Sequence, residues 1–264
     1  MNKISIEQNT GKLYQSCFEI FDDEQWLHQG ELLAEQLGLN RQQVADKVCF
    51  DGGCGHGALV YQLAQLGAQQ VVGLDLEPTI KAEKFNNLNV EFIKGSLLEI
   101  PFPDDHFDLV VSSGVVHHTV DPEKAFSELV RILKPGGKIV LGVYGKHGLF
   151  PWILWCARLV TVKVPLIRQP LMDRLISIFG FDPIIRYQIL DYLYVPLLKR
   201  YSPRQLLKEY FHKNGLRDAH RIANITPEKG RKFTSQRTSY SYDYRTFKSR
   251  LLFGHGFIVI EATK

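Results

Sequence analysis

Cysteine is scarce in this chain, with four residues in 264, at Cys17, Cys49, Cys54 and Cys156. They show neither the paired spacing of a zinc site nor the density of a disulfide framework. The sequence therefore excludes a small disulfide-stabilised secreted fold, and we expect no metal centre. Free cysteines are typical of a reducing compartment, which predicts a cytoplasmic protein.

Long uncharged apolar runs are also missing. The first twelve residues, MNKISIEQNTGK, lack the apolar core of a signal peptide. Residues 149–167 are strongly apolar, but Arg158, Lys163 and two prolines interrupt them, which argues against a membrane span. The sequence leaves open a peripheral contact of this stretch with a membrane or with a partner protein.

Acidic residues become rare in the second half. Residues 1–143 carry 11 Lys/Arg and 20 Asp/Glu, a balance of −9, whereas residues 144–250 carry 20 and 7, a balance of +13. Such asymmetry predicts two functional parts and, for the second, an anionic acceptor or partner. A solvated basic surface would give the same counts, so both interpretations stay open here.

Apolar periodicity predicts the secondary structure. Short β-rich runs alternate with helix-period segments up to residue 143, which indicates βαβ units around a parallel sheet. Lys134-Pro135-Gly136-Gly137 is expected to end one helix and turn the chain into the next strand. The predicted helices are 12–38, 57–67, 122–133 behind Asp121-Pro122, and Ser202-Pro203 to about 213. The predicted strands are 47–51, 70–75, 89–94, 107–112, 137–143, 216–223 and 255–262.

A glycine-rich loop, DGGCGHG at 51–57, follows the first predicted strand. Such a loop lets backbone N–H groups and a helix N-terminus approach a ligand closely. Gly53 to Ala58 also fits the dinucleotide pattern G-x-G-x-x-G/A, and a tight structural turn is the plain alternative. Asp75, which ends the second strand, is placed to accept hydrogen bonds from ribose hydroxyls. Asp51 would repel a pyrophosphate but favour a sulfonium ligand with a free ammonium group.

These motifs, with VVGLDLE and the segment IPFPDDHFDLVVSSGVVHHTVDPEKAFSELVRILKPGGKIVLGVY, resemble the class I S-adenosylmethionine-dependent methyltransferases. The segment looks especially like the small-molecule and lipid enzymes of the ubiquinone and sterol type. The resemblance covers residues 45–143 strongly and the last two strands more loosely. It implies an α/β fold with a Rossmann-like seven-stranded sheet of order 3-2-1-4-5-7-6 and an antiparallel strand 7. N-terminal helices and a mostly helical insertion after strand 5 complete the expected fold.

The resemblance also implies S-adenosyl-L-methionine as cofactor, S-adenosyl-L-homocysteine as product, and no metal. Asp51 and the glycines would surround the methionine part of the cofactor, Asp75 would hold the ribose, and Leu76 would pack on the adenine. The family often has an aspartate after the third strand for the adenine amino group, where this chain has Ser96, so a weaker contact is expected. The expected cofactor-binding residues are Asp51, Gly53, Gly55, Gly57, Asp75, Leu76, Ser96, Leu97 and Ser113.

Methyl transfer is an in-line displacement, in which an enzyme aligns the acceptor and, for a hydroxyl, helps to remove its proton. His117 and His118 follow strand 4, near the expected acceptor site, and imidazole titrates near neutral pH. His117 is the preferred catalytic base, and a structural turn without proton transfer is the alternative. Tyr144 is a candidate for lining the pocket, and Tyr14 for closing over it.

The predicted organisation has four parts: an N-terminal helical cap (1–44), a cofactor-binding core (45–143), a helical substrate-binding insertion (144–200), and the completion of the core (201–264) with a basic loop at 226–250. We expect methyl transfer to an oxygen or nitrogen of a small, partly apolar, anionic metabolite. RNA or protein methylation is the alternative, because aromatic and basic residues are interleaved at 229–250. Nucleic acid is the less favoured partner, since no Asn/Asp-Pro-Pro-aromatic motif follows strand 4. An NAD-dependent oxidoreductase and a catalytically silent cofactor-binding protein are more remote alternatives, and no motif indicates the oligomeric state.

Overall fold

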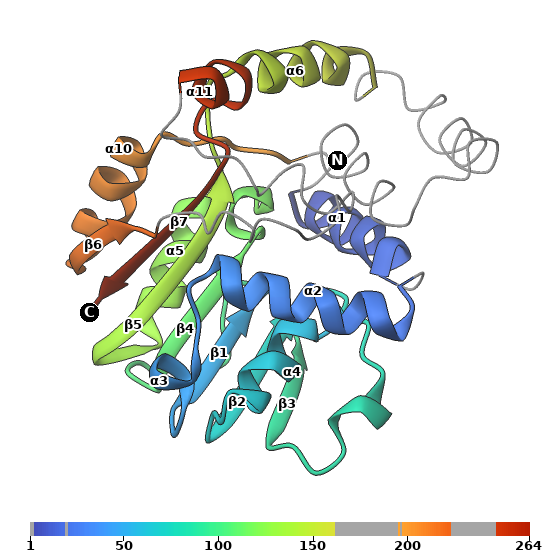
Figure 1. The fold of residues 1–264 in the computed structure, drawn as a ribbon, viewed down its shortest axis with the longest axis vertical. Helices are drawn as coiled ribbons and strands as arrows, with labels where there is room; N and C mark the ends of the chain where they lie inside the picture. The colour runs from blue at the N-terminus through green and yellow to red at the C-terminus, as the bar shows by residue number, and fades with distance from the viewer. Residues whose placement is uncertain (1–2, 19–20, 162–194, 196, 223–246) are drawn as a thin grey trace.

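The computed structural model describes residues 3–18, 21–161, 195, 197–222 and 247–264. These residues form a seven-stranded sheet of order β3-β2-β1-β4-β5-β7-β6, in which β7 is antiparallel to both of its neighbours (Figure 1). The expected fold class, strand order and antiparallel last strand are therefore confirmed. The strands are β1 Val48–Gly52, β2 Gln70–Asp75, β3 Val90–Lys94, β4 Phe107–Ser113, β5 Leu133–Tyr144, β6 Arg217–Arg221 and β7 Phe257–Thr263.

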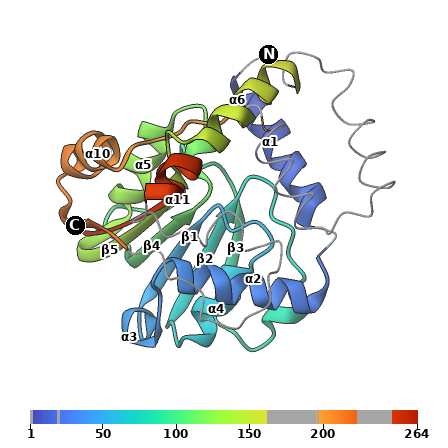
Figure 2. The same cartoon turned by 45° about the horizontal axis from the view of Figure 1, so that its top comes forward.

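The central strands are buried on both faces, which is why they are almost continuously apolar in sequence. Phe50 of β1 packs on one side of the sheet with Phe126 and Leu129, and Cys49 packs on the other side with Leu63. The sheet accordingly lies between two helical layers, with α2 and α4 on one face and α5 and α10 on the other (Figure 2). The helices of these layers are α2 Asp23–Gln36, α4 Ala58–Gln65, α5 Pro122–Arg131 and α10 Pro203–Leu206.

The N-terminal region holds two helices where the periodicity predicts one. The predicted helix at 12–38 is wrong, because the structure has α1 at Lys3–Phe18 and α2 at Asp23–Gln36. Asp22 begins the second helix: its carboxylate accepts a hydrogen bond from the Gln25 backbone N–H at 2.8 Å, and the Gln25 side chain accepts one from the Asp22 N–H at 3.3 Å. This reciprocal cap starts a new helix. The break frees α1 to lie beyond the carboxyl ends of β1 to β4 (Figures 1 and 2).

Other predicted boundaries are close to the observed ones. Asp121 caps α5 by accepting a hydrogen bond from the Lys124 N–H, and Ser202 caps α10 through the Gln205 N–H. Lys134 to Gly137 do not form the predicted turn but belong to β5, which starts at Leu133 with a register shift against β4. The short α3 is Arg41–Val44.

The substrate-binding insertion lies only partly within the described residues. Its first helix, α6 Leu149–Thr161, contacts α11 Phe247–Phe253 above the end of β5 (Figure 1). Residues 162–194 of the predicted helical insertion, and 226–246 of the predicted basic loop, lie outside the described part of the chain. Within that part, no helix is both long and apolar enough to cross a membrane.

Candidate active site

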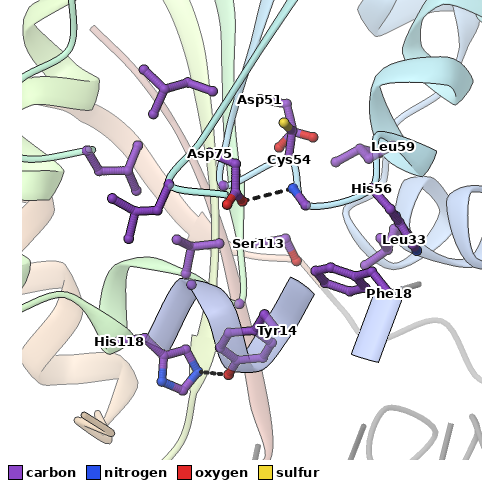
Figure 3. Close-up of a pocket in the computed structure, with 18 of the residues that line it drawn as sticks. Tyr14, Phe18, Leu33, Asp51, Cys54, His56, Leu59, Asp75, Ser113 and His118 are labelled. Atoms are coloured by element: carbon purple, nitrogen blue, oxygen red, sulfur yellow. Dashed lines mark hydrogen bonds between the residues drawn. The ribbon is translucent and has the colours of Figure 1, made fainter. Parts of the chain in front are cut away.

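A pocket opens where the parallel strands end, roofed by the N-terminal helices. Strand ends and the loops after them supply Asp51, Asp75 and Ser113, while α1 supplies Tyr14 and Phe18 (Figure 3). The carboxyl edge of an open parallel sheet is where such folds bind their ligands. Of the residues expected to bind the cofactor, the following line this pocket: Asp51, Gly53, Gly55, Asp75, Leu76, Ser96, Leu97 and Ser113.

The loop between β1 and α4 presents bare backbone to the pocket. Gly53 has φ +92°, and a Cβ on it would lie 2.2 Å from Cγ2 of Val115, so only glycine fits there. The Gly53 and Cys54 N–H groups donate to the Leu74 carbonyl at 2.7 and 3.1 Å, which ties the loop to β2. These bonds fix the loop against the sheet at the edge of the pocket.

The N-terminal helices hold the other side of this loop. The indole N–H of Trp26 donates to the His56 carbonyl at 2.9 Å. The ring centroid of Phe18 lies 4.5 Å from that of the His56 imidazole. Burial lowers the pKa of His56 to about 3, so its ring is neutral. His56 therefore packs on the loop against Phe18, and it also lines the pocket.

Two carboxyl groups lie together in the pocket. Asp75 accepts a hydrogen bond from the N–H group of Gly55 at 2.9 Å (Figure 3) and another from that of Glu77 at 3.0 Å. Asp51 is only 2% exposed. Burial, and secondarily the charge of Asp75, raises the pKa of Asp51 to about 7; burial also raises the pKa of Asp75. A pair of desolvated acids favours a ligand that brings positive charge and hydrogen-bond donors.

Two of the predicted site residues do not line the pocket. Gly57 has φ +78° and caps α4, and a Cβ on it would meet the ring of Phe85 at 2.9 Å, away from the pocket. His117 is 1% exposed and packs on Tyr144 at 4.6 Å between ring centroids. Neither of its ring nitrogens has a hydrogen-bond partner among the described residues, and burial holds its pKa well below the usual range. The preferred catalytic base is thus buried behind the pocket wall.

His118, the second residue of the histidine pair, faces the pocket instead. Its Nδ1 lies 2.6 Å from the Leu197 carbonyl oxygen, which can only accept, so Nδ1 carries the proton. Its Nε2 is then the acceptor for the hydroxyl of Tyr14 at 3.0 Å (Figure 3). The carbonyl fixes the tautomer, and the arrangement gives the pocket a hydroxyl hydrogen-bonded to an imidazole nitrogen that can take up a proton.

A group of cations adjoins this end of the pocket. The Arg200 guanidinium lies 5.7 Å from the ring centroid of Tyr144, which lines the pocket, and the Lys199 N–H donates to the His117 carbonyl at 3.0 Å. A second hollow lies next to these residues. It is lined by Lys146, Trp155, Arg158, Leu198, Lys199 and Arg200.

The sequence reasoning missed most of the roof of the pocket. Glu7, Phe18, Phe21 and Gln29 line it from the two N-terminal helices and the link between them, whereas the sequence predicts only Tyr14 there. The sequence carries little signal for these pocket residues, because they are spread along two helices and form no motif. A buried Glu7 opposite the non-acidic Ser96 is visible only in the folded chain.

Comparisons with known proteins agree with this geometry. Residues 50–141 match the family described as a methyltransferase domain. A probable chloroplastic tocopherol O-methyltransferase of Oryza sativa subsp. japonica is 35% identical over 120 residues, covering 42% of this chain and 30% of that protein. The ubiquinone/menaquinone biosynthesis C-methyltransferase of Francisella tularensis subsp. novicida is 32% identical over 101 residues, covering 35% of this chain and 40% of that protein.

Solved structures share the fold at low identity. The 1,6-didemethyltoxoflavin-N1-methyltransferase of Burkholderia thailandensis, solved with its substrate and S-adenosylhomocysteine, superposes with a TM-score of 0.57 at 13% identity, over 99% of this chain and 88% of that one. This likeness shows the fold alone. The chain spans half or less of the length of the curated relatives that it matches.

Proposed function

We propose that this chain, whose core is a class I S-adenosylmethionine-dependent methyltransferase domain, transfers a methyl group to an oxygen or nitrogen of a small, partly apolar, anionic metabolite. One observation carries the proposal. A single pocket holds the buried Asp51 and the partly buried Asp75 at one end and the Tyr14–His118 pair at the other (Figure 3). The first pair suits a cationic nucleoside, and the second suits an acceptor that must lose a proton.

The residues present fit S-adenosylmethionine. The backbone of Gly53 and Gly55 lines the pocket without side chains, and Asp51 is a buried carboxyl group facing the pocket, where an ammonium or sulfonium would compensate its charge. We assign Asp51, Gly53, Gly55 and the backbone at Ser113 to the methionine part, and Asp75 to the ribose. Leu76, Ser96 and Leu97 are assigned to the adenine, and Gly57 supports the loop without contacting the cofactor. When bound, this cofactor supplies an electrophilic methyl group.

The acceptor would be activated by Tyr14 and His118. The Tyr14 hydroxyl donates to Nε2 of His118, and a phenolic oxygen can accept as well as donate, so the acceptor group would donate its hydrogen bond to the Tyr14 oxygen. During the transfer the acceptor proton would pass to the Tyr14 oxygen and the Tyr14 proton to Nε2 of His118. The methyl carbon would exchange its bond to the sulfonium sulfur, which keeps the electron pair as a neutral thioether, for a bond to the acceptor atom. The Leu197 carbonyl keeps the imidazole oriented throughout. We therefore transfer the role of general base from His117 to His118.

The cations beside Tyr144 support the anionic character of the acceptor. Lys146 and Lys199 reach the hollow from two segments that run together, because the Lys146 N–H donates to the Tyr201 carbonyl. A carboxylate or phosphate there would be held by charge-assisted hydrogen bonds. Its apolar part would extend past Tyr144 toward Tyr14.

The activity is tested with methyl-labelled S-adenosylmethionine and a small-molecule extract alongside RNA and protein fractions. We expect saturable binding of S-adenosylhomocysteine and label in an anionic, solvent-extractable product. Label that disappears on ribonuclease or protease treatment would instead establish the macromolecular alternative. Tight binding of NADH without binding of S-adenosylhomocysteine would overturn the methyltransferase assignment.

Neutralising Lys146 and Lys199 together, as Lys146→Gln and Lys199→Gln, should raise the KM for the labelled acceptor on the order of a hundredfold or more, since each of the two lost charged hydrogen bonds costs roughly 1.5–3 kcal/mol. The kcat and the dissociation constant of S-adenosylhomocysteine should change little, because neither lysine lines the cofactor pocket. Lys213→Gln is the matched control, as Lys213 is 66% exposed and pairs with Glu123 on the surface. An unchanged acceptor KM would contradict the anionic acceptor.

A further inference from the structure

At the end of the pocket beyond Asp75, the loop after β3 supplies no carboxylate, and a residue of α1 supplies one instead. The loop after β3 reads Gly95-Ser96-Leu97, with no carboxylate facing the pocket. Glu7 fills this place from the opposite wall: it is 7% exposed, it lines the pocket, and its Oε2 lies 3.4 Å from Oγ of Ser96. A residue 89 positions earlier in the chain thus brings a carboxylate to the loop.

The contacts of Glu7 hold its carboxylate in place but use only part of its capacity to accept hydrogen bonds. Oε1 accepts a hydrogen bond from the Val120 N–H at 2.9 Å, and Oε2 accepts a long one from the Ser96 hydroxyl, which itself accepts from the Leu98 N–H. No lysine, arginine or histidine among the described residues forms an ion pair with Glu7. A carboxylate accepts about four hydrogen bonds. A buried one with two partners is stabilised by a further N–H donor from a ligand.

The walls around Glu7 indicate which donor it meets. Leu76 and Leu97 are apolar and flank the same end of the pocket. A Cβ on Gly11 of α1 would lie 3.2 Å from Cβ of Leu76, so α1 packs directly on this wall. A flat ring between apolar side chains, with an amino group at its edge, fits this space; a ring with a carbonyl there would place oxygen against carboxylate.

We propose that Glu7 accepts a hydrogen bond from the exocyclic amino group of the cofactor's adenine, with Ser96 holding the carboxylate in place. This inference rests on the proposed function, since it assumes an adenosyl ligand. Glu7 and Tyr14 are seven residues apart, about two helical turns, so they project from the same face of α1. Contact between Glu7 and the adenine therefore also holds Tyr14 next to His118. In this way α1 couples recognition of the cofactor to the position of Tyr14 in the acceptor site.

The test compares S-adenosyl-L-homocysteine with S-inosyl-L-homocysteine, which carries a carbonyl in place of the amino group, by isothermal titration calorimetry. The wild-type protein should prefer the adenosyl ligand by at least about tenfold. In Glu7→Gln this preference should shrink to near parity or reverse, because the amide oxygen can still accept from Val120 while the amide nitrogen donates to the inosyl carbonyl. Glu31→Gln is the control, since Glu31 is 67% exposed on α2 and should leave the preference intact.

A second variant pair separates recognition from folding. Glu7→Ala should lose the preference, and adding Ser96→Asp should restore it by placing the carboxylate on the β3 loop instead of on α1. Failure to bind either ligand in the wild type would overturn the proposed function. Wild-type binding of both ligands with equal affinity, or a preference that survives in Glu7→Gln, would overturn the role of Glu7 while leaving the methyltransferase assignment standing.

Discussion

Replacing Asp51 by asparagine should stabilise the ligand-free protein at pH 8 and leave it almost unchanged near pH 4. The folded state raises the pKa of this carboxyl from 3.8 to about 7, chiefly through burial. Between these values the folded chain holds a proton that the unfolded chain releases, so stability falls as the pH rises. A pKa shift of three units corresponds to on the order of 4 kcal/mol of folding free energy. The wild-type protein loses this stability between pH 4 and pH 8, and the asparagine variant does not.

The measurement is the free energy of unfolding by urea for both proteins from pH 4 to pH 8. The difference between them should grow with pH in favour of Asp51→Asn. Asp104→Asn is the control, because Asp104 is 72% exposed and its pair with Arg131 at the surface is worth at most about 1 kcal/mol. A difference that does not vary with pH would show that the folded chain does not perturb the Asp51 carboxyl.

The same substitution should weaken cofactor binding, because the destabilising carboxylate is what attracts a cationic ligand. Binding of S-adenosylmethionine to the wild type should tighten as the pH rises through about 7 and should release a proton, since the ligand favours the ionised carboxylate. Calorimetry in buffers of different ionisation enthalpy detects that proton. In Asp51→Asn both the proton release and the pH dependence should vanish, which separates charge recognition from a loss of shape.

The sheet and the cofactor end of the site could be predicted from sequence because their signals are local. Asp51, the glycine loop and Asp75 follow consecutive strands, so chain order alone brings them to one edge of the sheet. The antiparallel β7 followed from the family resemblance, and the pairing of β7 with β5 and β6 bears it out.

The roof of the pocket could not be predicted in the same way. The only local signal for the break near Asp22 is the capping pair Asp22 and Gln25, and the helical periodicity of residues 12–38 outweighed it. Glu7 gains its place from Val120 and Ser96, over a hundred and almost ninety residues away. The choice between His117 and His118 likewise depends on the Leu197 carbonyl, which selects the ring that faces Tyr14. Long-range contacts of this kind leave no periodicity in the sequence.

Loss of the imidazole at position 118 is expected to give the largest effect on catalysis. A positioned general base contributes roughly 10²–10⁴-fold, so His118→Ala should lower kcat by about that factor. Tyr14→Phe should also lower kcat, because it removes the hydroxyl that connects the acceptor to Nε2 of His118. Neither change should greatly alter the dissociation constant of S-adenosylhomocysteine, since both side chains lie at the acceptor end of the pocket.

His117→Phe is the matched comparison, since its ring is buried, has no hydrogen-bond partner among the described residues and does not line the pocket. A phenyl ring keeps the packing on Tyr144 without burying two unpaired nitrogens, so kcat should fall far less than in His118→Ala. Added imidazole should restore part of the activity of His118→Ala if that side chain takes up the proton. An inactive His117→Phe beside an active His118→Ala would return the role of base to His117 and imply that the pocket rearranges when the acceptor binds.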